Sequence, residues 1–507
     1  MLTRIVPRYP ALVINGNEKS LVIADLHLGF EAKLSSNNIY LGKNTSVTET
    51  AKDIEKILGL KGLDSEEEKN EAIVKKANIK KKQNIAETKI IEKKIEEREV
   101  PVARVTFNHG SSQLSDEDLL KIKKVANIVK KRHNDGNEII VVVSAMSGVT
   151  NELIKKSNLI SKNFDNKELD VLLSSGEQVS CSLLSGALID LGVKARSWLG
   201  WQIPIVTNDN HTSSQIMKIK TGEILNFISK KGVAVIAGFQ GISKEIRITT
   251  LGRGGSDLSA VAVAKFFKTD SCEIYTDVKG VFTTDPSINE KAKKIDKISY
   301  EEMLEMASLG AKVVQPNAVQ ASMMDNIPIH VRSTFSETSG TKIIPESEID
   351  YKKIVTGVAY SKGNAKVSVV GVVDKPGVAA DVFEPIGKNN INIDMVIQNT
   401  SLDGKKANIT FTIKREDLKK TLSLIEKNKQ KLNYNKITQD DKLAKISIIG
   451  AGMQANAGVT HKMFRSLADE KINILAISTS EIKISVLIRE DLTQKAVKAL
   501  HKTFGLN

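Results

Sequence analysis

Several residue types are scarce in this chain, and each scarcity excludes a class of protein. Only two of the 507 residues are cysteines, so no disulfide framework is expected and the setting is a reducing, cytoplasmic one. No apolar run reaches about 18 residues, and the opening MLTRIVPRYP lacks the apolar core of a secretory signal. We therefore expect a soluble protein with no targeting segment and no membrane partner.

Aromatic residues are also scarce, at 4% of the chain, although the formal net charge is +14. A basic chain can bind nucleic acids or other polyanions. Here, however, the lysines are scattered among glutamates, and aromatic side chains on which bases could stack are too few. We therefore expect no nucleic-acid partner. The length is sufficient for about three domains.

The residues that are present are organised around the stretch 249–286, TTLGRGGSDLSAVAVAKFFKTDSCEIYTDVKGVFTTDP. A Gly-rich turn precedes a run with helical spacing, and the strand CEIYTDV follows. Glycines let backbone N–H groups close around a phosphate, and a helix beginning there directs its positive dipole end at the same anion. Arg253 and Asp257 flank the turn, and the polar pair Thr276 and Asp277 ends the next strand. The pattern predicts a nucleotide-binding turn, with an ordinary tight turn as the alternative; it matches neither the P-loop nor the dinucleotide signature.

The rest of the chain divides by composition. Residues 1–60 contain two short apolar runs, ALVI and SLVIADLHLG, which predict a hairpin. Residues 61–100 are almost all Lys, Glu, Asn and Ile, as in a charged linker, either a solvated helix or a disordered tether. From residue 101 the strand VPVARVTF, an amphipathic helix at about 115–132 and the buried run EIIVVVSA alternate. This order predicts a three-layer α/β domain.

Three motifs in sequence, TLGRGGSD, YTDVKGVFTTDP and GAKVVQP, resemble those of aspartokinases, within the amino-acid kinase family. The similarity runs from about Arg104 to the C-terminus. It implies a three-layer amino-acid kinase domain with a parallel-rich sheet at 101–340, followed by two ferredoxin-like ACT domains at 360–430 and 442–507. The C-terminal third agrees, because the order strand, turn, amphipathic helix, strand occurs twice in it.

A second, shorter resemblance lies near the N-terminus. Asp25 and His27 stand one residue apart at a strand end, which resembles the first metal motif of calcineurin-like metallophosphoesterases. A two-metal site needs further Asp, Asn and His ligands, and no string that would supply them follows. The segment is therefore interpreted as a truncated phosphoesterase start without metal activity, and no metal ligands are assigned.

The aspartokinase resemblance implies L-aspartate as the substrate and three residues that bind it. Thr150 in VSAMSGVTNEL and Glu177 in LLSSGEQVS are placed at strand-to-helix turns, and Glu177 would hold the amino group of aspartate. Arg253 would pair with its carboxylate. The alternatives are a first-turn acidic residue that stabilises the helix dipole at 177 and a surface arginine at 253. The substrate role is favoured because each is expected to follow an apolar strand, where parallel sheets collect ligands.

The same resemblance implies an ATP site. Its residues, drawn from the turn and the two following motifs, are Gly254, Gly255, Thr276, Asp277, Phe282 and Lys312. The alternative for Lys312 is an exposed helical lysine. Mg²⁺ would bridge the phosphates, with Asp257 near the ion or orienting the phosphates. Arg253, Asp257 and Lys312 would carry catalysis by alignment and charge stabilisation, since the accepting carboxylate is already ionised and needs no general base.

Two cationic contacts of the family pattern are missing. Ungapped alignment of the KFGGTS loop puts Phe107 at its Lys, Asn108 at its Phe and His109 at its first Gly, and Ser287 stands where an Arg often follows DP. Loss of one such group commonly lowers the rate about a hundred- to a thousandfold. Two hypotheses remain. One is an aspartate kinase that makes 4-phospho-L-aspartate for lysine, threonine and methionine synthesis. The other is a catalytically impaired pseudokinase that acts as an ACT amino-acid sensor or regulatory subunit.

The ACT repeat implies feedback regulation by an amino acid, with lysine or threonine as the effector. The stretches 375–378 with 392–398, and 454–459 with 473–479, resemble effector-binding turns. Plain structural turns of a small α+β fold are the alternative. By the same resemblance a homodimer or larger homo-oligomer forms through the ACT domains.

Overall fold

The computed structural model describes residues 11–16, 19–24, 33–34, 39–40, 102–107 and 116–507, except 311–312, 351–352, 402–403 and 454–455, with side chains from residue 118 onward. The chain divides into two units, residues 1–98 and 99–507. In the first unit β1 (Ala11–Gly16) and β2 (Lys19–Ala24) pair antiparallel, which confirms the predicted hairpin. The short strands β3 (Lys33–Leu34) and β4 (Ile39–Tyr40) also pair. Asp25, His27 and the predicted linker 61–100 lie outside the described residues.

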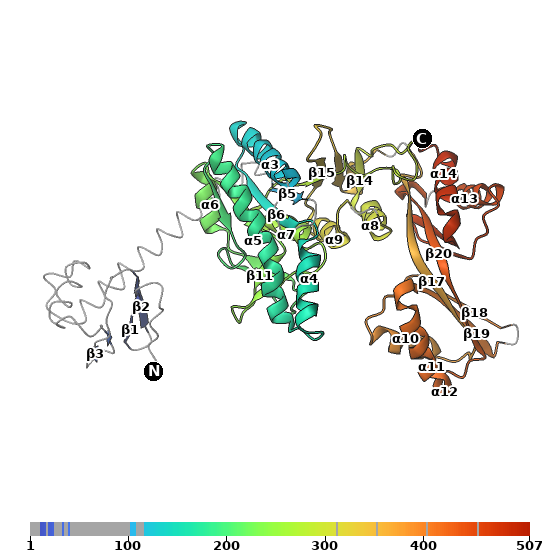
Figure 1. Cartoon of the computed structure of the whole chain (residues 1–507). Coiled ribbons are helices and arrows are strands. Elements are labelled where there is room, and N and C mark those ends of the chain that lie inside the picture. The colour runs from blue at the N-terminus through green and yellow to red at the C-terminus, as the bar shows by residue number, and fades with distance from the viewer. Residues whose placement is uncertain are drawn as a thin grey trace. The chain divides into compact units, whose positions relative to one another are not determined.

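The second unit begins with an eight-stranded sheet of order β14-β16-β15-β13-β5-β6-β10-β7. Figure 1 labels β5, β6, β14 and β15 of this sheet. Its strands are β5 (Val102–Phe107), β6 (Ile140–Met146), β7 (Ala195–Trp198), β10 (Val233–Ala237), β13 (Cys272–Thr276), β14 (Lys297–Ser299), β15 (Ile329–Ser333) and β16 (Thr341–Ile344). The run from β15 to β7 is parallel throughout, and only the β15–β16 pair is antiparallel. The predicted parallel-rich sheet is confirmed.

Helices cover both faces of this sheet. On one face α3 (Asp116–Asn134) and α5 (Asn166–Asp190) pack against Val141 and Val143 of β6. On the other face lies α7 (Gly255–Phe267), which contacts β5 and β6 and also packs against α9 (Pro316–Asp325). The remaining helices of this part are α4 (Val149–Ile160), α6 (Gly222–Ser229) and α8 (Tyr300–Ser308). Because successive strand residues face opposite sides, a strand as apolar as β6 requires this double cover.

A second, smaller sheet lies in the same N-terminal part of this unit and has the order β12-β11-β8-β9. Its strands are β8 (Ile205–Thr207), β9 (Ile216–Ile219), β11 (Gln240–Ile242) and β12 (Ile248–Thr250). The strand β12 leads directly into the Gly-rich turn and α7, so this sheet sets where the turn begins.

The C-terminal part is one antiparallel sheet of six strands, of order β18-β19-β17-β20-β22-β21. The strands are β17 (Gly357–Val373), β18 (Val396–Thr400), β19 (Lys406–Lys414), β20 (Lys436–Ile449), β21 (Ala476–Thr479) and β22 (Lys483–Arg489). The helices are α10 (Val378–Gly387), α11 (Leu418–Lys427), α12 (Lys429–Leu432), α13 (Gly458–Asp469) and α14 (Thr493–Thr503). Strand, helix, two strands and helix occur twice in this order, as the predicted repeat requires.

The two repeats exchange strand halves at the centre of the sheet. Residues 364–373 of β17 pair with β19 and supply the first core, whereas residues 357–361 pair with residues 445–449 of β20. Val358 accordingly packs in the second core, with residues from β20, β22 and α14. The start of β17 therefore belongs structurally to the second repeat, although it precedes the first in sequence.

Polar contacts connect the second repeat to the α/β part of the same unit. His501 of α14 is wholly buried, and its Nε2 lies 2.8 Å from Oγ1 of Thr283. Lys483 Nζ donates to Oε2 of Glu305 over 2.7 Å, and the Ala451 amide donates to Glu302 over 3.0 Å. Among the described residues, none of the helices combines the length and apolarity needed to cross a membrane.

Candidate functional site

Four neighbouring parallel strands end at a common edge of the main sheet. The register aligns Tyr275 of β13 with Val105 of β5, Val105 with Val143 of β6, and Val143 with Ala237 of β10. Each strand ends at or within a few residues of this level. Ligands collect at such carboxyl ends, because the loops that follow them diverge and leave a crevice.

Glu177 reaches this edge from the side, through α5. A Cβ on the preceding Gly176 would lie 2.8 Å from Cβ of Ala145, so the glycine lets the helix approach the end of β6 closely. Glu177 Oε1 accepts a 3.0 Å hydrogen bond from the Ala145 amide. Its Oε2 is buried and has no hydrogen-bond partner in the described part of the chain. Burial raises the pKa of this carboxyl to about 7, although the Ala145 amide acts in the opposite direction.

The prediction that Glu177 heads a helix after a strand is wrong. Helix α5 begins eleven residues earlier at Asn166, where Asp165 caps it by accepting from the amides of Lys167 and Glu168. Glu177 is therefore a mid-helix residue, which also excludes the interpretation as a first-turn residue that stabilises the dipole. The capping signal DNKE was present in the sequence and marks the true start.

Thr150 does lie at the strand-to-helix turn after β6. It is the second residue of α4, and Gly148 at the N-cap adopts a left-handed φ of 85°. Gly176 of α5 also faces this turn, because its Cβ would stand 3.3 Å from Cγ1 of Val149. The structure thus brings Thr150 and the Glu177 segment to the same strand end.

The Gly-rich turn is tied to the start of α9. Gly254 caps α7 with a φ of 72°, and a Cβ there would lie 2.3 Å from Cγ of Gln315. The buried Asp257 accepts a 3.0 Å hydrogen bond at Oδ2 from the Gln315 amide. The side chain of Arg253 is exposed. Gly255 begins the helix, and Lys312, three residues before Gln315, lies outside the described residues, as do Asn108 and His109.

A buried polar cluster that the sequence did not suggest supports the other side of this turn. Asp170, about two helical turns before Glu177 on α5, is wholly buried. It lies 2.6 Å from Nδ1 of His211, accepts from the Thr212 amide over 3.1 Å, and accepts from the hydroxyl of Thr250. Thr250 ends β12 just before the turn. One rigid helix therefore fixes both the carboxyl of Glu177 and the start of the Gly-rich turn.

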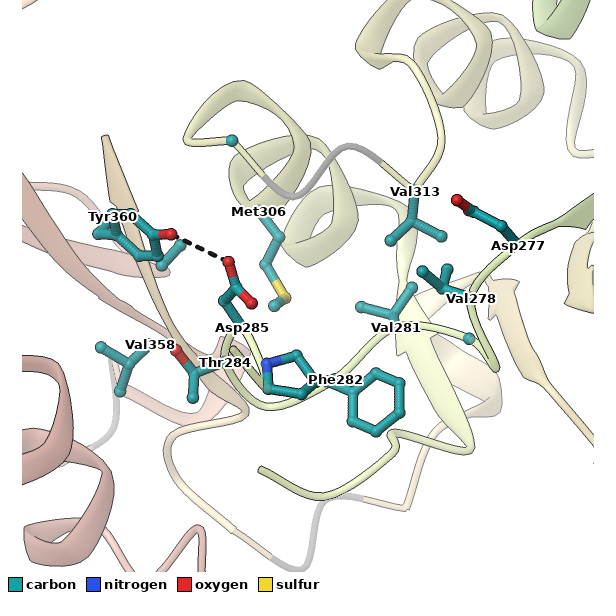
Figure 2. Close-up of a pocket in the computed structure, with 14 residues that line it drawn as sticks. Asp277, Val278, Val281, Phe282, Thr284, Asp285, Met306, Val313, Val358 and Tyr360 are labelled. Carbon is teal, nitrogen blue, oxygen red and sulfur yellow. Dashed lines mark hydrogen bonds between the residues drawn. The ribbon is translucent and has the colours of Figure 1, made fainter. Parts of the chain in front are cut away.

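A pocket of about 490 Å³ opens next to the end of β13 (Figure 2). Its lining comes from the segment after β13, from α8 and the residues after it, and from β17: Asp277, Val278, Gly280, Val281, Phe282, Thr284, Asp285, Pro286, Met306, Gly310, Val313, Val358, Ala359 and Tyr360. Of the predicted ATP residues, Asp277 and Phe282 line it. The buried Thr276 donates to Oδ1 of Asp277 over 2.9 Å. The predicted aspartate residues do not belong to this lining.

The family follows from comparison with known proteins. Residues 109–333 match the amino acid kinase family, and residues 367–428 and 446–504 each match an ACT domain. An aspartate kinase of Stutzerimonas stutzeri is 45% identical over 388 residues, which cover 76% of this chain and 94% of that protein. An aspartokinase of Mycolicibacterium smegmatis is 42% identical over 80% of this chain and 97% of its own length. The chain belongs to the aspartokinase family.

Solved structures agree in fold. Escherichia coli aspartokinase III, in complex with aspartate and ADP, aligns over 80% of this chain and 100% of its own, with a TM-score of 0.65 and 23% identity. The Clostridium acetobutylicum aspartate kinase gives a TM-score of 0.64 at the same identity and coverage. The family model matches and the identity to curated relatives confirm the predicted family with its kinase and paired ACT domains, and the solved structures confirm the fold.

Proposed function

We propose that this aspartokinase transfers the γ-phosphoryl group of ATP to the β-carboxylate of L-aspartate, giving ADP and 4-phospho-L-aspartate, the first step towards lysine, threonine and methionine. The observation that carries the proposal is the 45% identity to a protein named aspartate kinase over 94% of that protein's length. The arrangement of buried and exposed polar groups at the strand ends supports it.

Aspartate binds, in this proposal, between Glu177, Thr150 and Arg253. The ammonium group of the substrate pairs with the buried carboxylate of Glu177, whose Oε2 has no donor among the described residues to satisfy it. The exposed guanidinium of Arg253 pairs with a substrate carboxylate in a fork geometry. The Asp170 cluster sets the distance between the Glu177 carboxylate and the Arg253 guanidinium, because it holds the strand before Arg253 to the helix that carries Glu177.

ATP occupies the pocket beside β13, with its base near Phe282 and its phosphates towards the end of β13 and the Gly-rich turn. Gly254 and Gly255 lie at the positive end of α7, which favours an anion. Asp257 contributes by holding the start of α9 through the Gln315 amide, and the ammonium group of Lys312 supplies positive charge for the phosphates.

Mg²⁺ fits this site as a companion of the nucleotide. The described residues hold no cluster of three or more His, Cys, Asp or Glu side chains that could bind a metal alone. Mg²⁺ is typically held by one or two carboxylates together with phosphate oxygens and water, and the exposed carboxylate of Asp277 lines the pocket. When bound there with ATP, the ion would neutralise part of the negative charge of the phosphates.

The chemistry then needs alignment more than proton transfer. An oxygen of the ionised β-carboxylate attacks the γ-phosphorus, and the bond from that phosphorus to the β,γ-bridging oxygen breaks, leaving ADP with the electron pair. No proton has to leave the nucleophile near neutral pH. The protein contributes by fixing Glu177 and Arg253 on one side and the phosphate-directed groups on the other.

The test measures ADP release with ATP, Mg²⁺ and aspartate, together with trapping of the acyl phosphate by hydroxylamine. Both signals should require aspartate, and glutamate should not replace it. Aspartate-independent ADP release without hydroxamate would contradict the proposal.

The second candidate, an amino-acid sensor without turnover, is favoured by one observation: Phe107 stands where the family motif has its lysine, and Ser287 where it often has an arginine. Comparison of the natural chain with a Phe107→Lys, His109→Gly variant separates the two. If the natural chain is an impaired kinase, the variant should gain about a hundred- to a thousandfold in kcat. If the natural chain is active and the variant has no higher kcat, the interpretation as an amino-acid sensor without turnover is excluded.

For regulation, we propose lysine or threonine as the effector at the ACT pair. Residues 375–378 lie at the start of α10 and residues 392–398 lead into β18, whereas 473–479 lead into β21 at the equivalent place in the second repeat. Gln454 and Ala455 of the remaining stretch lie outside the described residues. Either amino acid should change activity or melting temperature when it is added to the full-length chain. Assembly through the ACT domains and a cytoplasmic location remain part of the proposal.

A further inference from the structure

The pocket assigned to ATP has one wall that does not come from the kinase domain. Val358, Ala359 and Tyr360 lie at the start of β17 and line it together with Asp277 and Phe282. Figure 2 shows Val358 and Tyr360 on one strand, on the side of the pocket away from Asp277. All three pair with β20, Val358 lies in the core of the second ACT repeat and Tyr360 packs against it, so the regulatory part of the chain supplies this wall.

The wall is joined to the kinase loop by two hydrogen bonds. The amide of Val358 donates to the carbonyl of Thr283 over 2.8 Å. The hydroxyl of Tyr360 donates to Oδ2 of Asp285 over 2.9 Å, as the dashed line in Figure 2 marks. Burial, together with this bond to a carboxylate, raises the pKa of Tyr360 to about 12.

Asp285 in turn shapes the loop that follows. Its Oδ1 accepts from both the amide and the hydroxyl of Ser287, at 2.9 and 2.7 Å. Burial opposes ionisation of Asp285, but these bonds and the one from Tyr360 outweigh it and lower its pKa. The turn from 284 to 287 is thus fixed from within by Ser287 and from outside by Tyr360. Ser287 stands where the family often carries an arginine, and in this chain its hydrogen bonds to Asp285 stabilise the turn.

The wall is also largely apolar, which suits a nucleobase better than a phosphate. Val358 is 1% exposed and supports the wall from the core of the second ACT repeat, whereas the half-buried Tyr360 presents its ring, and Met306 of α8 belongs to the same lining. Carboxylates lie on both sides of the pocket, Asp285 next to Tyr360 and Asp277 on the other side (Figure 2), and both repel a bare phosphate. An aromatic base gains most from apolar surface and from the face or edge of a tyrosine ring.

We propose that Tyr360, at the start of the regulatory sheet, is a nucleotide-binding residue: with Val358 supporting it from the core, it forms the wall against the base of ATP, and it positions the 284–287 turn through Asp285. This inference rests on the proposed function, because it assigns a second set of residues to the same ATP pocket. It makes the nucleotide a ligand of both the kinase domain and the second ACT repeat.

The experiment titrates the full-length chain with Mg²⁺–ADP by calorimetry, which requires no turnover. Tyr360→Phe removes only the hydroxyl and should raise the ADP dissociation constant about three- to tenfold. Tyr360→Ala also removes the ring and should raise it by more than about tenfold. Tyr434→Phe is the matched control, since Tyr434 is a buried tyrosine of the first ACT core and is not part of the pocket lining. It should change the constant less than about twofold. The KM for aspartate should stay constant in all three.

Asp277→Ala, on the kinase side of the pocket, separates failure of the proposed role of Tyr360 from failure of the pocket as the ATP site. If it weakens ADP binding while both Tyr360 variants bind like the natural chain, the ACT wall plays no part and the inference is wrong, although the pocket remains the ATP site. If none of the variants affects ADP binding, the pocket assignment fails and the inference fails with it, and the assay of ADP release then decides the kinase activity independently. Equal increases in the KM for aspartate and in the ADP dissociation constant would indicate general damage and also contradict it.

Discussion

The buried carboxyl of Glu177 makes aspartate binding depend on pH near neutrality. Its pKa is about 7 in the chain without ligand, because burial disfavours the charged form. The proposed partner, the substrate ammonium, needs the carboxylate. About one tenth of the molecules carry it at pH 6 and about nine tenths at pH 8. Since apparent affinity scales with the competent fraction, the KM for aspartate should fall about tenfold from pH 6 to pH 8.

The assay is initial-rate ADP release at saturating Mg²⁺–ATP over this pH range, with the KM for ATP measured in parallel to detect titration of the nucleotide. Glu177→Gln keeps the shape and can still accept the hydrogen bond from Ala145, but it cannot ionise. It should raise the KM for aspartate by about two orders of magnitude, the typical effect of losing one partner of a buried charge pair. Its KM should also lose the pH dependence. The reasoning would be refuted if the KM of Glu177→Gln for aspartate depended on pH as steeply as that of the natural chain. It would also be refuted if the KM of the natural chain did not change with pH.

The same pKa has a consequence for stability with a defined sign. A folded-state pKa raised from 4.5 to about 7 means that the folded chain binds the proton more tightly than the unfolded chain. This contributes about 3 kcal/mol of stability below a pH of about 4.5, which is lost as the pH rises through about 7. Relative to the natural chain, Glu177→Gln should therefore gain stability between about pH 5 and pH 8. Ligand-free melting curves at both values measure this.

Two further predictions concern the turn and the interface with the second ACT repeat. Gly254→Ala should lower the melting temperature and kcat more than Gly136→Ala. Both glycines have positive φ, but only at Gly254 would the added Cβ lie 2.3 Å from a side-chain atom. Equal effects of the two substitutions would show that this contact is unimportant. For His501, burial, with Lys353 and Lys293 nearby, lowers the pKa of its imidazole, so it stabilises the fold above pH about 6.5 and loses this as the pH falls. Relative to His501→Gln, the natural chain should therefore lose melting temperature between about pH 7.5 and 5.5, since both proteins share the titration of Glu177; parallel curves for the two proteins would contradict this.

Much of the fold followed from local patterns. The Gly-rich turn and α7 were predictable, since positive φ demands glycine and the apolar spacing after it is helical. So were the buried parallel strands and the repeated ACT pattern, whose periodicities do not depend on distant contacts. The location of Glu177 was mispredicted because the motif around it resembles a strand end, whereas the capping residue Asp165 marks where α5 begins.

Other features were decided only by tertiary structure. Asp170 has no sequence pattern that marks it, because its partners His211, Thr212 and Thr250 are 41 to 80 residues away and meet it only when β12 packs on α5. The carboxyl of Glu177 acquires its raised pKa from burial, which no local pattern encodes.

The sequence by itself determined the elements, their order and the chemical types at the strand ends, because turn chemistry and hydrophobic period act over a few residues. Only the folded chain decided that the start of β17 pairs with the second ACT repeat and that Tyr360 reaches Asp285 at the pocket beside β13. Strand pairing and pocket walls depend on contacts between segments distant in sequence, and their register is fixed by the packing of whole sheets.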